Sequence, residues 1–382
     1  MKKKETVYCG ADVLARDGMA ALRRAGVQDP GRCGLITNPT GVLKNMTSTV
    51  DMLAQVCDLQ ALFGPEHGVR GDAQAGGEVD SFYIDPSTGL PVYSFYGKGL
   101  ADAEKVMTSL DTIFFDIQDI GARFYTYQYT MTDAMIRCAA AGVRFVVLDR
   151  PNPIGGTRVE GTILDRRFST FVGRYPTATR SGLTVGEFAL CINETEKIGC
   201  DLHVIPCEGW QRAMDFDDTD LLFVQPSPNL PTVDTAYSYI GTCIIEGTNL
   251  SEGRGTTKPF EILGAPWVDV RALLDAVGEQ PGVYLREAYF TPTFSKHAGQ
   301  LCHGVQLHIH DRDAYRPFAT GLRIFCAILK NHPEETAMRP SIVNLLGTDD
   351  ILQADFDAEQ YIAREAEKVA VWQNRTRAYY LY

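Results

Sequence analysis

The sequence predicts an α/β protein of two domains, the first built on a mostly parallel sheet and the second of mixed α/β structure. Its 382 residues correspond to two or three domains at about 150 residues each. Over roughly the first 150 residues, short β-rich runs alternate with helical patterns, which is typical of βαβ units. After residue 160 this alternation loosens. We expect the boundary between about 155 and 185, and we take 1–165 and 166–382 as the two domains.

The first domain is expected to alternate helices and strands along the chain. Apolar residues recur at helical spacing over 11–25, which predicts an amphipathic helix there. Further helices are predicted at 49–56, 101–110 and 127–141. Strands, each a short apolar run, are predicted at 33–37, 58–63, 112–117 and 143–148.

The second domain is expected to mix the two kinds of element less regularly. Thr184 and Glu187 have the spacing of a capping box, which predicts a helix that continues to about residue 198. Further helices are predicted at 271–277, 317–329 and 358–372. The predicted strands are 201–205, 221–224, 243–246 and 305–310.

Charge and composition exclude several kinds of partner. Thirty-six basic and 48 acidic side chains give a formal net charge of -12. This balance argues against nucleic acid or an anionic membrane as partner, because both favour basic surfaces. A small anionic substrate stays compatible, since a few arginines can reverse the local field.

The cysteines and the N-terminal sequence indicate where the protein works. Ten cysteines are scattered along the chain without a CxxC pair, so we expect reduced core thiols and no disulfide framework. The lysines at residues 2–4 are followed by no apolar segment of a signal peptide. No window approaches the roughly 18 apolar residues of a membrane span. As it stands, the sequence predicts a soluble cytoplasmic protein; removal of a leader would instead make it secreted or periplasmic.

Polar loops rich in glycine or proline follow the first four strands. They begin at Asn38, Gly64, Asp116 and Asp149. Because ligands of open α/β sheets bind at the carboxyl ends of the strands, we expect a site here that includes Asn38 and Gln118. The alternative is that these loops are ordinary turns, which favour the same residue types.

The common nucleotide and hydrolase motifs are missing. GxGxxG after a strand, GxxxxGK[ST] and GxSxG do not occur, so we expect no cofactor. Carboxylates remain, and glycoside hydrolysis needs two of them. Glu66 is the best candidate for a general acid, because it follows an apolar run that would disfavour its charged form. His67 would hydrogen-bond it or a substrate hydroxyl.

Other candidates lie in three further segments. Asp116 and Asp119 would supply a second carboxylate, with Arg123 and Tyr125 binding substrate, or they form an ion-paired loop. Arg150 either binds substrate or pairs with Asp149. The glycine-rich segment 246–257 and the stiff segment 225–231 would line the same cleft, with the candidate binding residues Asn229, Glu246, Asn249, Glu252 and Arg254. A surface loop is the alternative for 246–257.

Metal binding is not expected. His308 and His310 share one face of a predicted strand, with His303 nearby. A metal site needs further ligands and supporting residues that this segment does not supply, so ordinary strand histidines are the better interpretation.

Six motifs stand out along the chain: GLITNPTG from residue 34, LFGPEHG from 62, DIQDIGARFYTY from 116, DRPNPIGG from 149, PSPNLPT from 226 and EGTNLSEGRGT from 246. Together they resemble one known family, the exo-β-N-acetylmuramidases of the NamZ type. The resemblance runs from about residue 7 to the C-terminus. It implies a Rossmann-like N-terminal domain, a smaller C-terminal domain and an active-site cleft between them. It also implies release of N-acetylmuramic acid from the non-reducing end of peptidoglycan fragments, with Glu66 as the catalytic residue. The missing export signal departs from many relatives.

These expectations define one leading hypothesis and two alternatives. The leading hypothesis is a cofactor-free exo-glycosidase in which Glu66 is the general acid and Arg123 or Arg254 binds the lactyl carboxylate. Its partner carboxylate is one of Asp116, Asp119, Glu246 and Glu252. The alternatives are a non-catalytic muropeptide- or sugar-binding protein, and a hydrolase of another bond with Cys57 or Ser251 as nucleophile. The substrate would be a small anionic amino sugar, and the oligomeric state stays open.

Overall fold

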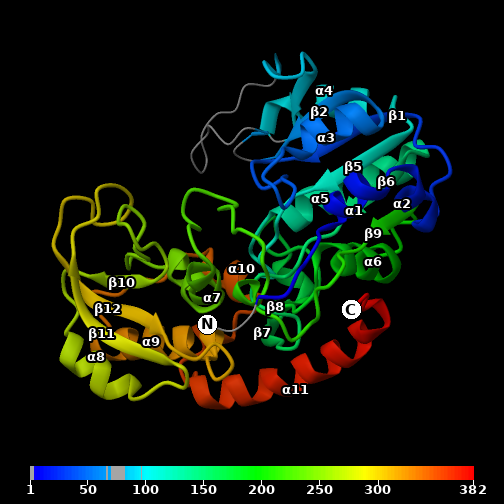
Figure 1. Cartoon of the computed structure of the whole chain (residues 1–382). Helices are drawn as coiled ribbons and strands as arrows, with labels where there is room; N and C mark the ends of the chain where they lie inside the picture. Colours follow the sequence, from blue (N-terminus) through cyan, green and yellow to red (C-terminus); the bar gives the residue numbers. More distant parts are fainter. Residues whose placement is uncertain (1–3, 66–67, 70–81, 96) are drawn as a thin grey trace.

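The computed structural model describes residues 4–65, 68–69, 82–95 and 97–382 (Figure 1). Glu66 and His67, two of the predicted site residues, lie outside this part of the chain. The described residues form a large domain with a mostly parallel sheet and a smaller domain with an antiparallel sheet. The predicted fold class is confirmed.

The first domain is organised around one twisted sheet. In the described part of the chain this sheet has seven strands in the order β3-β4-β2-β1-β5-β6-β9, and only the edge strand β3 runs antiparallel to its neighbour. The strands are β1 (Arg32–Thr37), β2 (Asp58–Gly64), β3 (Phe82–Ile84), β4 (Pro91–Ser94), β5 (Thr112–Asp116), β6 (Arg144–Leu148) and β9 (Leu202–Ile205). The predicted strands of this domain are confirmed to within a residue or so.

Helices cover both faces of this sheet. They are α1 (Gly10–Asp17), α2 (Met19–Arg24), α3 (Thr49–Val56), α4 (Leu100–Met107), α5 (Tyr127–Ala141) and α6 (Val185–Thr195). Alternate strand residues pack on opposite faces: Phe114 belongs to the core under α1–α3, and Phe115 to the core under α4–α6. Strands buried on both faces are apolar at nearly every position, which explains why the sequence shows them clearly.

One predicted helix of the first half is corrected, and the first sheet extends further than expected. The helix expected over 11–25 is two helices, because Gly18 between α1 and α2 has a φ of 53° that ends the first. The first sheet continues beyond the expected boundary at 165/166, because β9 pairs in parallel with β6 and completes it. Between them the chain forms a hairpin of β7 (Glu160–Ile163) and β8 (Ala178–Arg180).

The second domain packs helices against a small sheet of order β10-β12-β11 in the described chain. Helices α7 and α9 cross closely, because Gly241 and Gly321 face each other without side chains. The elements are α7 (Val233–Thr242), β10 (Ile262–Ala265), α8 (Val270–Val277), β11 (Val283–Phe290), β12 (Cys302–Ile309), α9 (Pro317–Asn331), α10 (Ile342–Leu346) and α11 (Ala358–Thr376). Short 3-10 turns are η1 (Gly97–Gly99), η2 (Arg166–Phe168), η3 (Phe216–Asp218), η4 (Cys243–Gly247), η5 (Asp350–Leu352) and η6 (Arg377–Tyr379).

Two of the strands expected in the second half do not form. Residues 221–224 are irregular, and the run at 243–246 continues α7 as the turn η4. A short buried apolar run has the same appearance in a strand and in a buried helix end, so the pattern could not separate the two. The helices predicted near α8, α9 and α11 are confirmed.

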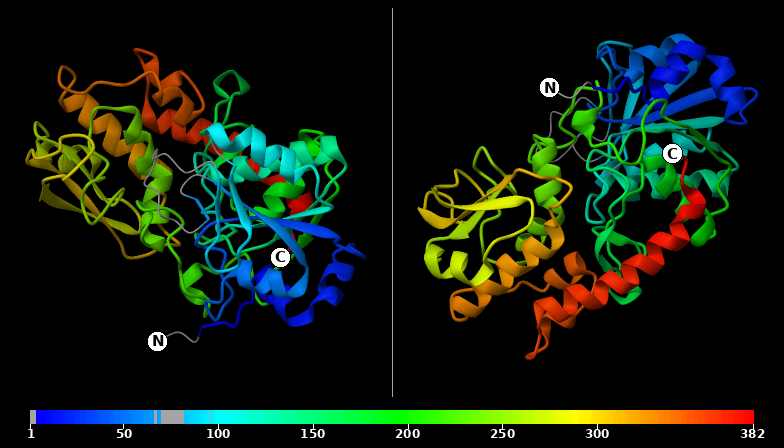
Figure 2. Two further views of the ribbon diagram at one scale, coloured as in Figure 1. Left: turned by 90° about the horizontal axis from the view of Figure 1, so that it is seen from above. Right: turned by 60° about the horizontal axis from the view of Figure 1, so that its bottom comes forward.

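Helix α11 connects the two domains. It contacts β7 and α9 and runs alongside both domains, so that the C-terminus lies beside the first one (Figures 1 and 2).

The thiols agree with the sequence prediction: all ten cysteines are free, eight are buried, and Cys57 and Cys326 are half-buried. None of the helices in the described residues has the length and apolar character needed to cross a membrane.

Candidate active site

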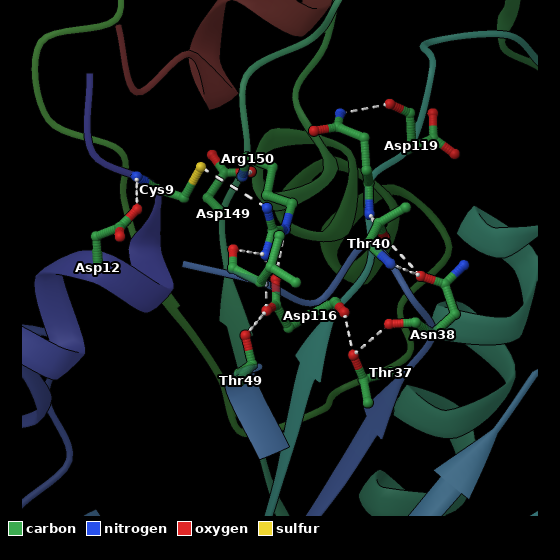
Figure 3. A network of polar contacts seen from close by, with 12 residues as sticks. Cys9, Asp12, Thr37, Asn38, Thr40, Thr49, Asp116, Asp119, Asp149 and Arg150 are labelled. Carbon is green, nitrogen blue, oxygen red and sulfur yellow. Dashed lines mark hydrogen bonds and ion pairs between the residues drawn. The ribbon is translucent and has the colours of Figure 1, made fainter. Parts of the chain in front are cut away.

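A buried ion pair braces the carboxyl edge of the parallel sheet (Figure 3). Asp116 ends β5 and is fully buried. Arg150, after β6, binds both its oxygens, with Nε 2.6 Å from Oδ1 and Nη2 2.8 Å from Oδ2. Thr49 Oγ1 donates to Oδ2 at 2.5 Å. Both charges are therefore used inside the fold, which corrects the expectation of Asp116 as a catalytic carboxylate and of Arg150 as a substrate-binding residue.

Asn38 and Gln118 are brought together above the ends of β1 and β5, as predicted. Asn38 Oδ1 accepts hydrogen bonds from the amide and hydroxyl of Thr40, at 2.9 and 2.5 Å. The Thr40 hydroxyl in turn accepts from the Gln118 amide at 2.8 Å. Gln118 Nε2 donates to the carbonyls of Asp119 and Pro151, at 2.7 and 2.9 Å. These two buried side chains thus fix the loops that carry the rest of the site.

Asp119 differs from the other acidic residues at this edge. Its Oδ1 accepts a hydrogen bond from the Gly121 amide at 2.6 Å. Its Oδ2 is buried and has no hydrogen-bond partner among the described residues. Burial raises the pKa of this carboxyl to about 7. A group with this pKa exchanges protons near neutral pH, which is the property a general acid or base requires.

A small cavity of about 180 Å³ lies where the two domains meet. Its walls come from the loop after β5, from the stiff segment near residue 228, and from α7 and the segment that follows it. The lining residues are Phe124, Tyr125, Thr126, Tyr127, Ser227, Pro228, Asn229, Tyr239, Glu246 and Arg254. The structure therefore unites Tyr125, Asn229, Glu246 and Arg254, four of the predicted binding residues.

The backbone carbonyl of Pro226 connects this cavity to the carboxyl edge of the parallel sheet. The carbonyl of Pro226 accepts a hydrogen bond from the Tyr127 hydroxyl at 2.8 Å and from Asn38 Nδ2 at 3.5 Å. Asp119 precedes Phe124, the first cavity residue, by five residues. The sheet edge and the cavity consequently form one continuous region, which we call the inter-domain site.

The charged residues of the cavity are paired with each other. Arg254 donates from Nη2 and Nε to Glu246 Oε1, at 2.6 and 3.1 Å. Its Nε also lies 3.4 Å from Oε1 of the buried Glu252. Glu252 binds Lys296 Nζ through its other oxygen at 2.8 Å. Glu252 therefore supports the site from behind and does not line it, which corrects its expected role as a binding residue.

The expected role of Arg123 in substrate binding is also corrected, because its guanidinium is hydrogen-bonded inside the protein. It is 1% exposed. Its Nη1 donates to the Thr162 carbonyl at 2.6 Å, and its Nη2 donates to the carbonyls of Leu345 and Leu346, at 2.9 and 2.8 Å. The guanidinium thus ties the loop after β5 to β7 and α10, and it cannot reach a substrate carboxylate.

Asn249 and the glycines of the 246–257 segment have structural explanations too. Asn249 Nδ2 donates to the Glu335 carbonyl at 2.7 Å, and its Oδ1 accepts from the Ala337 amide at 2.9 Å. A Cβ on Gly253 would lie 2.5 Å from the Ile262 carbonyl oxygen, and one on Gly255 would lie 2.5 Å from that of Phe294. Glycine is therefore needed for the packing of this segment on its neighbours.

The remaining candidates have ordinary contacts. Ser251 is 2% exposed and its hydroxyl accepts from the Gly253 amide at 3.2 Å. The Cys57 thiol donates to the Leu53 carbonyl at 3.3 Å. His310 stacks on Tyr284 with 4.2 Å between ring centres. No group of three or more potential metal ligands occurs in the described part of the chain.

Two residues of the site escaped sequence reasoning. Tyr239 lies on α7, a helix that was not predicted, and its ring packs edge-on against Phe260 at 4.6 Å. Lys296 comes from the loop between β11 and β12, far along the chain from the segment it contacts, and no local pattern marks it. Glu66 and His67 lie outside the described residues; Pro65 and Gly68, on either side of them, are joined by a 2.9 Å backbone hydrogen bond after β2.

Together, the fold and the cavity define a two-domain α/β enzyme with carboxylates and aromatic rings at the junction of its domains. Comparison with known proteins identifies its family. Residues 33–234 match the model described as exo-beta-N-acetylmuramidase NamZ, N-terminal, and residues 237–382 match its C-terminal counterpart. The chain belongs to the NamZ family of exo-β-N-acetylmuramidases, and it is a glycoside hydrolase.

Individual relatives agree with this assignment. The peptidoglycan β-N-acetylmuramidase NamZ of Bacillus subtilis (strain 168) is 50% identical over 337 residues, which cover 87% of this chain and 80% of the relative. Two solved structures of DUF1343 family proteins from Bacteroides fragilis NCTC 9343 share the fold. They superpose with TM-scores of 0.87 and 0.77, at 33% and 29% identity, over 98% of this chain and 99% of each of theirs. The family boundary near residue 235 agrees with the placement of β9 in the first domain.

Proposed function

We propose that this enzyme releases N-acetylmuramic acid from the non-reducing end of peptidoglycan fragments such as the disaccharide MurNAc-GlcNAc. The observation that carries the proposal is the inter-domain cavity, in which the Arg254–Glu246 pair is surrounded by aromatic side chains. Aromatic rings stack on sugar rings, and a guanidinium binds a carboxylate through two parallel hydrogen bonds. The name of the Bacillus subtilis relative, a peptidoglycan β-N-acetylmuramidase, supports the same substrate class.

Glu66 is the proposed general acid and Asp119 the proposed second carboxylate. Of the four residues considered for the second role, Asp116, Glu246 and Glu252 are each ion-paired. Asp119 alone among them keeps a carboxylate oxygen without a partner in the described residues. The loops that carry Glu66 and Asp119 follow β2 and β5, which are separated only by β1. Two strand spacings amount to about 10 Å, so the loops begin within reach of one bound sugar.

Arg254 is the proposed partner of the lactyl carboxylate. Its Nε and Nη2 bind Glu246, whereas its Nη1 has no hydrogen-bond partner among the described residues. The Nη1 edge is therefore the part of the guanidinium that an incoming carboxylate would occupy. Asn229 and the second oxygen of Glu246 would serve the hydroxyl groups of the same sugar.

Product analysis by NMR on a small MurNAc glycoside tests the activity and reports the anomer formed. We expect free N-acetylmuramic acid, and its anomeric configuration separates retention from inversion. Binding of the glycoside without turnover would contradict the proposal.

The variant Glu66→Gln tests the proposed acid. General acid catalysis contributes about 10²–10⁴-fold, so we expect a loss of at least about 100-fold in kcat with folding unchanged. Full activity in this variant would remove the role assigned to Glu66.

The cytoplasmic location stays a prediction of the sequence, which cell fractionation tests.

A further inference from the structure

Lys296 is almost completely enclosed by acceptors from a segment close to the cavity. Its Nζ donates to the carbonyls of Ile245 and Leu250 and to Glu252 Oε2, each at 2.8 Å. The side chain is 11% exposed. An ammonium group has three hydrogens to donate, and here each one has an acceptor within the segment 245–252.

The residues on either side of Lys296 have a strained backbone conformation, which the contacts of this loop enforce. Ser295 and His297, on either side of it, have φ values of 69° and 57°. This left-handed region is unfavourable for residues other than glycine, and it persists where the surroundings enforce it. His297 Nε2 lies 2.7 Å from the Asn249 carbonyl oxygen. Two consecutive side chains of one loop thus hold the segment 245–252 in place.

The charged side chains of Lys296, Glu252, Arg254 and Glu246 alternate in sign and form a row that ends in the cavity. Lys296 binds Glu252, Glu252 lies 3.4 Å from Arg254 Nε, and Arg254 binds Glu246. The four charges sum to zero. Without Lys296, the remaining row of Glu252, Arg254 and Glu246 would have a net charge of -1.

We propose that Lys296 is a positioning residue for substrate recognition: by binding Glu252, it keeps Arg254 available to a carboxylate of the substrate. The inference rests on the proposed function, because it assumes that Arg254 binds this carboxylate. Lys296 itself does not line the cavity, so it acts through Glu252 and Arg254. If Lys296 is lost, Glu252 draws Arg254 toward itself and the negative row repels an anionic ligand.

The test compares Lys296→Met with the unchanged enzyme on two ligands that differ only in charge. One is a MurNAc glycoside with a free lactyl carboxylate, and the other is its neutral lactyl amide. Charged hydrogen bonds are worth enough to change affinity by about 10–100-fold. We expect KM for the carboxylate to rise by at least about tenfold, with kcat changed by less than about threefold. KM for the amide should change by less than about threefold.

The double variant Lys296→Met/Glu252→Gln separates positioning from mechanical support. It removes one charge of each sign, so the row is neutral again while the contacts of the ammonium are still missing. We expect KM for the carboxylate to return to within about threefold of the unchanged enzyme. No rescue, or an equal rise in KM for both ligands, would overturn the proposal.

Further measurements keep the outcomes distinguishable. Lys368→Met on α11 is the matched control, because Lys368 Nζ also binds a buried glutamate, Glu365, at 2.6 Å; KM should be unchanged. If Lys296→Met does not fold, Lys296→Arg keeps the charge and should retain KM to within about fivefold. Calorimetric titration with N-acetylmuramic acid and its amide reads the same preference without turnover. An unchanged enzyme that binds both equally overturns the inference, whereas binding without hydrolysis overturns only the proposed function.

Discussion

At the scale of single residues, Asp119 links the chemistry of the site to the stability of the fold. Burial raises its pKa from 3.8 to about 7. Because the folded-state pKa lies above that of the unfolded chain, this carboxyl favours folding below about pH 4, and its contribution is lost as the pH rises through about 7. Asp119→Asn should therefore raise the free energy of unfolding by about 1–3 kcal/mol at pH 8 and change it little at pH 4. Urea unfolding at both pH values measures the difference.

The same variant should lose activity. If Asp119 acts as a base, kcat/KM of the unchanged enzyme falls about tenfold for each pH unit below about 7, and Asp119→Asn lowers it at least about 100-fold. Higher stability together with lower activity in Asp119→Asn would identify Asp119 as a functional group that the fold retains at a cost in stability. A variant that is less stable at pH 8 would show that the carboxylate has a favourable partner, contrary to the structure.

Arg123 and Arg254 should respond in opposite ways to replacement by methionine. Arg123→Met leaves the carbonyls of Thr162, Leu345 and Leu346 without their donor inside the protein. A buried acceptor left without its donor costs about 1–3 kcal/mol, so the melting temperature should fall while KM of the folded enzyme stays constant. Arg254→Met should raise KM with little change in melting temperature. Thermal melts and steady-state kinetics on both variants check this, and the reverse pattern would return Arg123 to the site.

The sequence predicts which loops lie together at the candidate site more directly than it predicts the role of each residue. Loops at the ends of parallel strands must lie together, so Asn38, Gln118 and Asp119 could be grouped without a structure. Whether a charge in such a loop faces the ligand or a buried partner depends on distant segments. Asp116 is paired by Arg150 from another strand end, and Arg123 by carbonyls near residue 345, and neither partner is visible in the local pattern.

At the scale of secondary structure, elements with a local signature were predictable and pairings between distant segments were not. Helix α5 and strand β5 follow from periodicity and from burial on both faces. The edge strand β9 joins β6 only after the chain has made the β7–β8 hairpin, so the domain boundary depends on a long-range pairing. For the same reason, the run at 243–246 could not be recognised as the continuation of α7.

The crossing of α7 and α9 makes a prediction for glycine. A Cβ on Gly241 would lie 1.9 Å from the Pro317 carbonyl oxygen, which belongs to backbone and cannot move aside. Gly241→Ala should cost about 3 kcal/mol or more, and it should raise KM, because α7 carries Tyr239 into the cavity. Gly142→Ala is the control: no atom lies within 4 Å of its Cβ, and its φ of 70° alone costs about 1–2 kcal/mol. Equal losses in the two variants, measured by urea unfolding, would contradict close packing as the cause.

At the scale of the whole molecule, the site exists only while the two domains keep their relative positions. Helix α11 leaves the second domain, and the residues after it return to the first (Figure 1). Leu381 donates its amide to Glu187 Oε1 at 2.8 Å, and the guanidinium of Arg212 lies 3.4 Å from the centre of the Tyr380 ring. The chain thus crosses between the domains near residue 235 and again through α11. These two connections hold the walls of the cavity together.

Tyr382 makes several contacts in the second connection, so its removal should uncouple the domains. Its hydroxyl donates to Asp149 Oδ2 and accepts from the Cys207 amide, both at 2.7 Å, and its ring packs edge-on against Trp210 at 5.0 Å. Tyr382 is half-buried, so Tyr382→Ala should destabilise the first domain by about 1–3 kcal/mol, chiefly because the buried Asp149 loses a hydrogen bond. Scanning calorimetry should then show two transitions where the unchanged protein shows one, with KM raised because the cavity walls move independently. Tyr284→Ala, which removes a side chain that is 66% exposed, should leave the transition unchanged. A single cooperative transition in Tyr382→Ala would mean that the connection near residue 235 is sufficient to couple the domains.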